Sequence, residues 1–525
     1  VSADVRTGKS TGPRSEMPGR FSGSDVGRNR VTQRFRAPTF RTGIRCEQLV
    51  KKGRSHRGNA GHEPVEPEAA SPAGSFGVPA GGRVRGLLAE LGLHLSKALG
   101  QNFLHDPNMA RWIVSQADLR GISQWVEVGP GLGALTPHLL ATRLPGVAVE
   151  KDNRLASFLV ERFGAEGIEV VNADATRWDL RPRFAHGPAL CIGNLPYRVT
   201  TPLLFHFLGE ASPAEQAIIM VQREVALRLA AAPATSDYGS LTLAIGRRWK
   251  VEYLRTVPPQ LFFPAPQVES AVLRLRRRSP AELPPCSGAW FERVVRAGFS
   301  QRRKQLRKLV AEWVPDWPST ARALGVREDA RAEDLDLARW VELARIAAGD
   351  IGRSAQDPGG EVFDVVDDRD QVTGQATRRE VHVNNLRHRA VHVLMFNHFG
   401  EIFLQKRSPW KDRHPGVWDS SASGHLDAGE DYPACALREV REELGVELAE
   451  VPVELARIEA SEATGMEFVR VYAARHEGPF DLPPSEIETG LFFAVQVVRE
   501  WIGRRPQDFA PGFLACFERW EAARR

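Results

Sequence analysis

The stretch Trp125-Val-Glu-Val-Gly-Pro-Gly-Leu-Gly133 decides the fold of the first half of this 525-residue chain. Its first four residues predict a buried strand, and three glycines at alternate positions follow them. Glycine lets a backbone approach a ligand closely, and the N-terminus of the helix expected at 134–142 faces the same point. The spacing is G-x-G-x-G, not the G-x-G-x-x-G of a dinucleotide-binding turn. The stretch therefore predicts a strand, a ligand-binding turn and a helix.

The same alternation continues outward along the chain. Further strands are predicted at residues 146–149, 168–171, 188–192 and 217–221, and helices at 84–91, 107–117 and 154–163. Strands that alternate with helices at this spacing are typical of a doubly wound, mainly parallel sheet. The sequence therefore predicts an α/β domain with a Rossmann-like sheet.

Polar residues stand where successive strands end, which is where open α/β sheets bind their ligands. Glu150 ends the second strand, where its carboxylate can accept both hydroxyls of a ribose, and Asp174 follows the third, where it can read an adenine amine. Asn194-Leu195-Pro196-Tyr197 follows the fourth strand. Carbonyl groups there can accept the protons of an amine, and the ring of Tyr197 can stack on a planar base. This arrangement is similar to S-adenosylmethionine-dependent methyltransferases that act on amino groups.

Four more segments make the resemblance specific: residues 100–104 (GQNFL), 238–239 (YG), 263–270 (FPAPQVES) and 299–307 (FSQRRKQLR). In this order they closely resemble the small-subunit rRNA adenine N6-dimethyltransferase family, over about residues 90 to 347. The resemblance implies dimethylation of two adjacent adenines in the 3′-terminal hairpin of the small-subunit (16S) rRNA. It also implies S-adenosylmethionine contacts at Gln101, Asn102, Leu104, Gly129, Gly131, Glu150, Asp174 and Asn194.

The catalytic segment of this half is expected at Asn194, Leu195, Pro196 and Tyr197, with Tyr197 stacked on a flipped base. Phe299 either stacks on the other face of that base or packs in the core of the helical region. Phosphate contacts are expected from a basic cluster in the predicted helical region: Arg302, Arg303, Lys304, Arg307 and Lys308. Lys151 and Arg198 depart from the family pattern, and neither is expected to touch a donor contact. The alternative is the related family that dimethylates large-subunit rRNA, but the residues at 101–104 and 301–304 favour the small subunit.

A second centre lies at Gly424-x5-Glu430-x7-Arg438-Glu439-Val-Arg-Glu442-Glu443, which matches the Nudix box at every fixed position. Glu439, Glu442 and Glu443 share one helical face, where three carboxylates repel one another unless a cation lies between them. Hard oxygen ligands indicate Mg²⁺ or Mn²⁺, with Glu430, Glu439, Glu442 and Glu443 as ligands. Glu439 or Glu443 can instead act as the base. The box implies a Nudix α/β/α sandwich over about residues 361–525.

Within the Nudix family, residues 388–392 and 418–425 resemble isopentenyl-diphosphate isomerases. Ser423, however, stands where those enzymes carry a catalytic cysteine, and a serine hydroxyl is far less acidic than a thiol. Hydrolysis of a small diphosphate substrate, of the nucleoside diphosphate type, is therefore preferred. Isomerisation and a non-catalytic binding module are the alternatives.

Composition and charge set the domain limits. A basic tail at 1–82, with 14 Lys/Arg against 4 Asp/Glu in its first 60 residues, is predicted to be disordered. It is followed by a methyltransferase domain at 83–283, an all-α RNA-binding subdomain at 284–348, a Gly-rich linker at 349–360 and the Nudix domain at 361–525.

No apolar run is long enough to span a bilayer. Five scattered cysteines argue against disulfides and a zinc site, and favour the cytoplasm. A monomer acting on the 30S particle is expected.

Overall fold

The computed structural model describes residues 81–92, 102–279, 282–349, 360–411 and 413–524. Nearly all of the tail that was expected to be disordered lies outside the described residues. The same holds for Gln101, for most of the linker at 349–360, and for part of the segment before Asn102.

The first sheet has seven strands in the order β4-β3-β2-β5-β6-β9-β7. β2 to β6 are mutually parallel, and β9 pairs antiparallel with both β6 and the edge strand β7. The bounds are β2 Gln124–Val128, β3 Gly146–Glu150, β4 Glu169–Asn172, β5 Ala189–Asn194, β6 Ala214–Gln222, β7 Trp249–Val257 and β9 Ser270–Arg277. The predicted Rossmann-like, mainly parallel sheet is confirmed.

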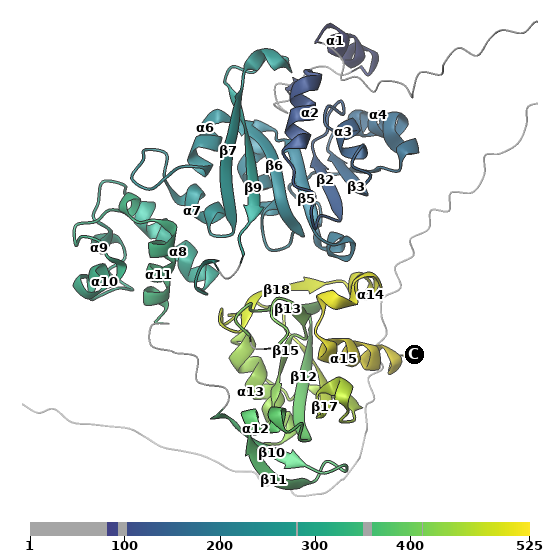
Figure 1. The fold of residues 1–525 in the computed structure, drawn as a ribbon, viewed down its shortest axis with the longest axis vertical. Helices are drawn as coiled ribbons and strands as arrows, with labels where there is room; N and C mark the ends of the chain where they lie inside the picture. The colour runs from purple at the N-terminus through teal and green to yellow at the C-terminus, as the bar shows by residue number, and fades with distance from the viewer. Residues whose placement is uncertain (1–80, 93–101, 280–281, 350–359, 412, 525) are drawn as a thin grey trace, which may run out of the picture. The chain divides into compact units, whose positions relative to one another are not determined.

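Alternate residues of these strands enter two separate cores, as the two-residue period of a strand requires. Trp125 packs with α2 (Pro107–Ser115), α3 (Thr136–Leu140) and α4 (Asn153–Phe163). Val126 and Val128 pack with helices on the opposite face, namely α5 (Thr200–Phe207), α6 (Arg223–Leu229) and α7 (Ser240–Gly246). Figure 1 shows α2, α3 and α4 beside β2 and β3. Short elements complete this part: α1 Gly81–Glu90, the pair β1 Phe103–Leu104 and β8 Phe262–Phe263, and single 3₁₀ turns η1 Gly164–Glu166, η2 Arg181–His186, η3 Tyr197–Val199 and η4 Pro259–Leu261.

The predicted all-α region follows the sheet. It contains α8 Gly288–Phe299, α9 Leu306–Leu309, α10 Trp317–Leu324, η6 Ala332–Asp334 and α11 Leu337–Ala348. Its core is centred on Trp340, which is fully buried. Gly298 has no side chain because a Cβ there would lie 2.4 Å from the Trp340 ring.

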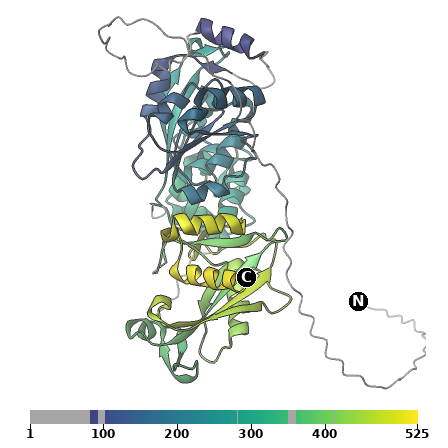
Figure 2. The same ribbon diagram turned by 90° about the vertical axis from the view of Figure 1, so that its right-hand side faces the viewer.

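The second half is built on another seven-stranded sheet, with the path β14-β13-β12-β17-β16 and with β15 and β18 paired to β12 and β13. Val391, Val393 and Met395 of β12 pack with α13, whereas Ala390 and Leu394 pack with α15. Figure 1 shows α13 and α15 on opposite sides of this sheet, and in Figure 2 α15, next to the C-terminus, faces the viewer. The α/β/α sandwich is therefore confirmed. The bounds are β10 Val362–Val366, β11 Val372–Thr377, α12 Arg378–Val383, β12 His388–Phe396, β13 Ile402–Arg407, β14 Trp418–Asp419, β15 Ala422–His425, α13 Tyr432–Leu444, β16 Val453–Ile458, η8 Glu462–Thr464, β17 Glu467–Arg475, β18 Ile487–Phe493, α14 Val495–Arg504, η9 Pro506–Asp508 and α15 Pro511–Ala522.

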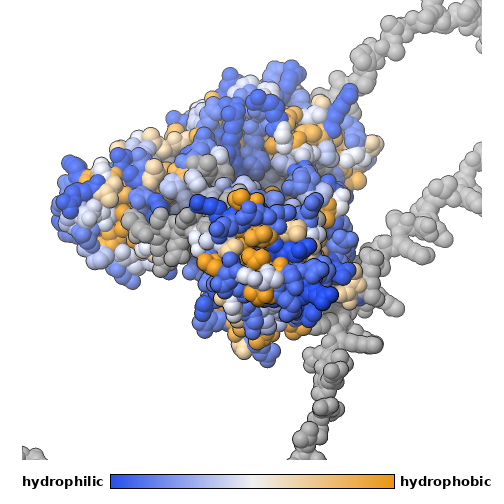
Figure 3. Space-filling view, turned by 60° about the horizontal axis from the view of Figure 1, so that its bottom comes forward, coloured by the Kyte–Doolittle hydropathy of each residue, from blue (hydrophilic) through white to orange (hydrophobic). Residues whose placement is uncertain are grey.

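Among the described residues, no helix is long and apolar enough to cross a bilayer. On the face drawn in Figure 3, small groups of apolar side chains are interspersed with hydrophilic ones.

Candidate active sites

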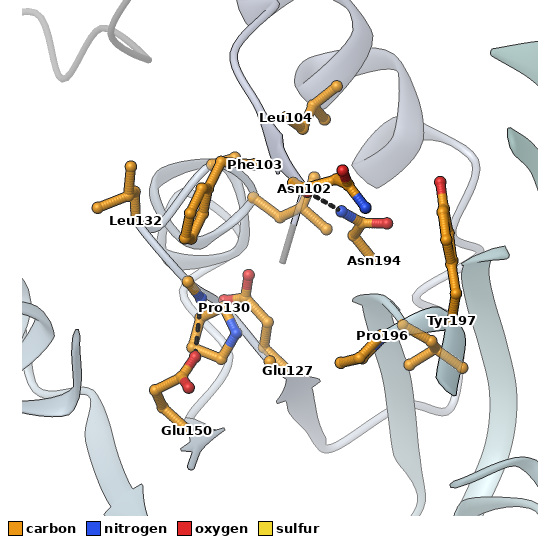
Figure 4. A pocket seen from close by; sticks show the side chains of 15 residues that line it. Asn102, Phe103, Leu104, Glu127, Pro130, Leu132, Glu150, Asn194, Pro196 and Tyr197 are labelled. Atoms are coloured by element: carbon orange, nitrogen blue, oxygen red, sulfur yellow. Dashed lines mark hydrogen bonds between the residues drawn. The ribbon is translucent and has the colours of Figure 1, made fainter. Parts of the chain in front are cut away.

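A cleft opens at the carboxyl ends of β2, β3 and β5 and encloses about 730 Å³ of space open to solvent. Its walls come from segments far apart in the chain, as Figure 4 shows. They include Asn102, Leu104, Gly129, Gly131, Glu150 and Asn194 to Tyr197, all of them predicted site residues.

The glycine turn after β2 needs its glycines for two reasons. Gly129, Gly131 and Gly133 have φ of 64°, 61° and 76°, a backbone conformation that residues with a Cβ rarely adopt. A Cβ on Gly131 would also lie 3.1 Å from the ring of Phe103, which lines the cleft. The turn therefore lets main-chain atoms form the floor of the cleft.

Two buried carboxylates face the cleft. Glu150 accepts hydrogen bonds from Gly131 N at 3.0 Å and from Asp152 N at 2.9 Å, so its position is fixed by main chain. Burial raises the pKa of Glu150. Glu127, inside β2, accepts a hydrogen bond from Thr136 Oγ1 at 2.7 Å. Burial, weakly assisted by Glu150, raises the pKa of Glu127 to about 8. Sequence reasoning did not select Glu127, although its place before the glycine turn was a usable signal.

Asn194 and Tyr197 are held in fixed orientations. Asn194 Nδ2 donates to the main-chain oxygen of Asn102 at 2.9 Å, which turns the amide oxygen toward Tyr197 (Figure 4). The Tyr197 hydroxyl shares a hydrogen bond with Ser270 Oγ at 2.6 Å, and Ser270 is fully buried. The amide oxygen and the ring thus stand at one side of the cleft, where they can meet an amine and the face of its base.

Asp174 is held by hydrogen bonds from Lys151 and Thr176. It is not among the residues that line the cleft. Its Oδ2 lies 2.7 Å from Lys151 Nζ, and its Oδ1 accepts from the amide and the hydroxyl of Thr176. These contacts lower the pKa of Asp174, the bond to Lys151 most of all. Lys151 was expected to contact none of the proposed donor-binding residues. This expectation is wrong, because its ammonium group donates a hydrogen bond to Asp174, the residue proposed to bind the adenine amine of the donor.

The helical region gives a mixed result. Phe299 stacks on Trp340, with 5.6 Å between ring centroids, and meets Tyr238 edge-on. It is partly buried against the helical core, so of the two expected places for Phe299 the structure supports the one in the core. The cluster of Arg302, Arg303, Lys304, Arg307 and Lys308 is exposed throughout. Arg302 nevertheless donates to the main-chain oxygen of Tyr238 at 2.6 Å, which links this cluster to the core.

In the second half, α13 presents the predicted carboxylates. Asp431 caps the helix by accepting from Ala434 N at 2.8 Å. Glu439 and Glu443, one turn apart, are buried, whereas Glu442 is exposed. A Cβ on Gly424 would lie 1.9 Å from Glu439 Oε1, so only glycine lets β15 pass this close to the carboxylate.

Arg438 supplies a positive charge among these carboxylates. Its guanidinium contacts Glu430 at 2.9 Å, Glu439 at 2.7 Å and Glu442 at 3.1 Å. Burial opposes the charged form of Glu430, but hydrogen bonds from Arg438 and from Asp427 N lower its pKa. The sequence argument required a cation between the acids and named only a metal, so it missed this role of Arg438.

Glu443 has different partners. Its Oε2 accepts from Ser423 N and from Gln405 Nε2, each at 3.0 Å. Burial raises the pKa of Glu443 to about 7, and burial and the proximity of Glu443 raise that of Glu439 well above its usual range. Gln405 Oε1 is buried with no hydrogen-bond partner among the described residues. Two buried carboxylates beside an unpartnered oxygen suit a divalent cation with hard oxygen ligands. The residues present therefore fit the magnesium that a Nudix domain implies.

Comparison with known proteins agrees with this division into two sites. Residues 92–348 match the family model "Ribosomal RNA adenine dimethylase", and residues 386–512 match "NUDIX domain". "Ribosomal RNA small subunit methyltransferase A" of Geobacillus thermodenitrificans is 38% identical over 276 residues, which are 50% of this chain and 94% of that protein. The protein of the same name from Methylobacterium radiotolerans is 43% identical over 285 residues, 53% of this chain and 96% of that protein.

Among solved structures, the 23S rRNA methyltransferase ErmE is 30% identical, with a TM-score of 0.40, and the match covers 47% of this chain and all of that one. The relatives named for the small subunit are matched over nearly their whole length at higher identity. The chain therefore belongs to the ribosomal RNA adenine dimethylase family, and a Nudix hydrolase domain is joined to the dimethylase within the same polypeptide.

Proposed function

We propose that the first half dimethylates N6 of two adjacent adenines in the 3′-terminal hairpin of the small-subunit rRNA. The observation that carries this proposal is the fixed amide oxygen of Asn194 beside the anchored ring of Tyr197, in the cleft at the carboxyl ends of the strands. We place the donor-binding domain at residues 83–283 and the RNA-binding subdomain at residues 284–348. We take the enzyme to be a monomer located in the cytoplasm.

The cleft residues divide the work of the reaction. S-adenosylmethionine, when bound, supplies a methyl group on a cationic sulfur, which is a good leaving group. The N6 lone pair of adenine is delocalised into the ring and is a poor nucleophile. The Asn194 oxygen, with a neighbouring main-chain carbonyl such as that of Leu195, would accept the N6 protons and free this lone pair. Positioning and oriented acceptors then provide most of the rate, and no strong base is needed beside Asn194.

The donor would be held by Asn102, Leu104, Gly129, Gly131 and Glu150, with Gln101 and Asp174 as further proposed contacts. The exposed basic cluster at 302–308 would hold phosphates, so that affinity for RNA falls as salt is added.

Methyl transfer to unmethylated 30S particles, with the modified positions mapped by mass spectrometry, tests this half. Dimethylation of two neighbouring adenines near the 3′ end of 16S rRNA is expected. Methylation of 23S rRNA alone, with 50S particles as the parallel substrate, would overturn it.

For the second half we propose metal-dependent hydrolysis of a small diphosphate of the nucleoside diphosphate type. Glu430, Glu439, Glu442 and Glu443 would hold Mg²⁺ or Mn²⁺, which supplies charge to stabilise the phosphates and lowers the pKa of a bound water. Glu443, with its pKa raised to about 7, is also suited to receive a proton. Ser423 stands where isomerases carry a cysteine, and its hydroxyl is far less acidic than a thiol, which favours hydrolysis over isomerisation.

A panel of nucleoside diphosphate derivatives, incubated with the full chain and Mg²⁺, tests this half. Phosphate release that depends on Mg²⁺ and is lost in Glu442→Gln is expected. Equal release by that variant would contradict the metal assignment. Conversion of isopentenyl diphosphate would favour the isomerase alternative, and metal binding without turnover would favour a binding module.

A further inference from the structure

A short turn of the dimethylase packs against the hydrophobic core of the Nudix domain. The turn is η2, which precedes β5. Its Phe184 contacts three aromatic residues, here called the aromatic socket: Trp418 of β14, Phe493 of β18 and Trp501 of α14. Their ring centroids lie 5.1 to 5.7 Å from that of Phe184. Ala185, the next residue, is buried in the same core, and both halves belong to one compact unit of the chain.

The apolar character of this contact favours a fixed arrangement. Domains joined by a linker move relative to each other unless their interface is substantial and hydrophobic. In the described part of the chain, Phe184 packs with the Nudix core and with neither core of the dimethylase sheet. The three socket residues are each at most 4% exposed. Separation would expose the ring of Phe184 and part of the socket to water, which is unfavourable.

Polar contacts surround the aromatic anchor. They are Arg181 with Glu401 at 3.1 Å, Arg277 with Glu488 at 3.8 Å, and Thr489 with Glu210 at 2.8 Å. In both ion pairs the dimethylase provides the cation and the Nudix domain the anion. A central aromatic anchor inside a rim of complementary polar groups is the anatomy of a specific protein interface.

The contact lies at the end of the first sheet that is remote from the donor cleft. Gln124, which begins β2, donates from Nε2 to the main-chain oxygens of Arg183 at 2.8 Å and Gly187 at 2.6 Å. Arg183 also pairs with Glu169, which begins β4, at 2.8 Å. These bonds fix η2 at the amino ends of the parallel strands, whereas the cleft opens at their carboxyl ends. The docked Nudix domain therefore leaves the cleft uncovered.

The contact also avoids the Nudix carboxylates. The socket belongs to the core on the α15 face of the second sheet, whereas α13, which carries Glu439 and Glu443, packs on the opposite face. Successive residues of β13 show this separation. Gln405 donates to Glu443, whereas Lys406 pairs with Glu488 of the polar rim at 3.1 Å. Each active site thus lies away from the contact.

We propose that the Nudix domain is stably docked on the dimethylase through the insertion of Phe184 into the aromatic socket, with both active sites available at the same time. The partner that the socket fits is the dimethylase half of this same chain. RNA bound by the dimethylase would then bring the hydrolase to the ribosomal particle, a consequence that rests on the proposed RNA substrate. The docking itself depends on neither activity.

The test cuts the folded full chain at a protease site inserted between Ser354 and Ala355, in the predicted linker. The two wild-type halves should co-elute in gel filtration at micromolar concentration. Phe184→Ala should raise the dissociation constant of the cut halves about 30-fold or more, because it truncates the central aromatic residue of the interface. Analytical ultracentrifugation of the cut protein over a dilution series measures this constant. Separate elution of the wild-type halves would overturn the proposal.

The matched control is Phe158→Ala, which removes another partly buried phenylalanine, on α4, that packs inside the dimethylase. Its cut halves should associate as tightly as those of the wild type. S-adenosylmethionine binding by Phe184→Ala, measured by calorimetry, should be unchanged, because the cleft is at the other end of the sheet. An unchanged dissociation constant of the cut halves in Phe184→Ala would contradict the docking.

A charge exchange tests the same interface with the anchor in place. Arg181→Glu and Glu401→Arg each put like charges opposite each other, and each should weaken the association about tenfold. The double variant restores an opposite-charge pair and should return to within about threefold of the wild type. Misfolding of the single variants does not produce such a recovery. Absence of recovery would overturn the proposed contact.

Discussion

The two active sites hold their carboxylates in opposite ways. In the donor cleft, Glu127 and Glu150 are satisfied by neutral groups, a threonine hydroxyl and main-chain amides. In the Nudix helix, Glu430, Glu439 and Glu442 share one guanidinium, that of Arg438. The first arrangement brings no positively charged side chain to these two carboxyl groups, and burial raises the pKa of both. The second partly neutralises the acids already, so a metal ion must compete with Arg438 for them.

The proposed methyl transfer and the proposed hydrolysis also depend on different kinds of protein groups. The cleft needs acceptors in fixed positions, and Asn194 supplies one without changing its charge. The Nudix helix needs groups that bind charge or exchange protons, and Glu443 is placed for that task. Removing Glu443 should therefore affect hydrolysis more strongly than removing Asn194 affects methyl transfer.

The largest effect is expected for Glu443→Gln. Loss of a carboxylate that binds metal or takes a proton should lower kcat of the hydrolase by about 10³-fold. Methylation of 30S particles by the same variant should not change. Glu447→Gln, an exposed residue beyond the end of α13, is the control. A loss below tenfold in steady-state phosphate release would show that Glu443 is not part of the catalytic group.

Asn194→Ala should lower the rate of methyl transfer by about 10²-fold, because one oriented acceptor is lost. The donor dissociation constant, measured by calorimetry, should change much less. Asn108→Ala, at an exposed position of α2, is the control. Full activity of Asn194→Ala would contradict the amine-acceptor mechanism.

The pKa of Glu127, raised to about 8 by burial, predicts a dependence of stability on pH. The folded state holds the proton more tightly than the unfolded state, whose ordinary value is 4.5. The associated stability is therefore fully present below pH 4.5 and is lost as pH rises toward 8. Gln does not titrate, so the midpoint temperature of thermal unfolding should fall less between pH 5 and pH 8 in Glu127→Gln than in the wild type. Parallel curves for the two proteins would show that Glu127 is already ionised in the folded state.

The smallest effect concerns Lys151. If Asp174 reads the adenine of the donor, Lys151→Leu frees its Oδ2 and should tighten S-adenosylmethionine binding about fivefold, which corresponds to about 1 kcal/mol. The gain should shrink in high salt, which screens the exposed ion pair of the wild type. Lys250→Leu removes a similar exposed ion pair, with Glu282 at 2.8 Å, and should have no effect. Unchanged binding by Lys151→Leu would remove Asp174 from the donor site.

How far the sequence predicted each region depends on how local its signals are. The strands, the glycine turn and the Nudix helix were correctly predicted because periodicity and turn chemistry act over a few residues. The two expected places of Phe299 could not be separated from the sequence, because its neighbour in the core, Trp340, is 41 positions further along the chain. The contact between Lys151 and Asp174, at 2.7 Å, was not predicted because 23 positions separate the two residues in the sequence.

The sequence alone therefore determined the two folds and the family resemblance, and it supplied the residues proposed for the two main chemistries, since all of these lie in contiguous motifs. Only the tertiary structure decided which cation neutralises which acid. It also brought His382, His388, His425 and Glu467 together, because strand register and a short helix place them at one end of a sheet. Their spacing in the sequence does not predict that these residues lie together, because their proximity follows from the pairing of β12 with β15 and β17.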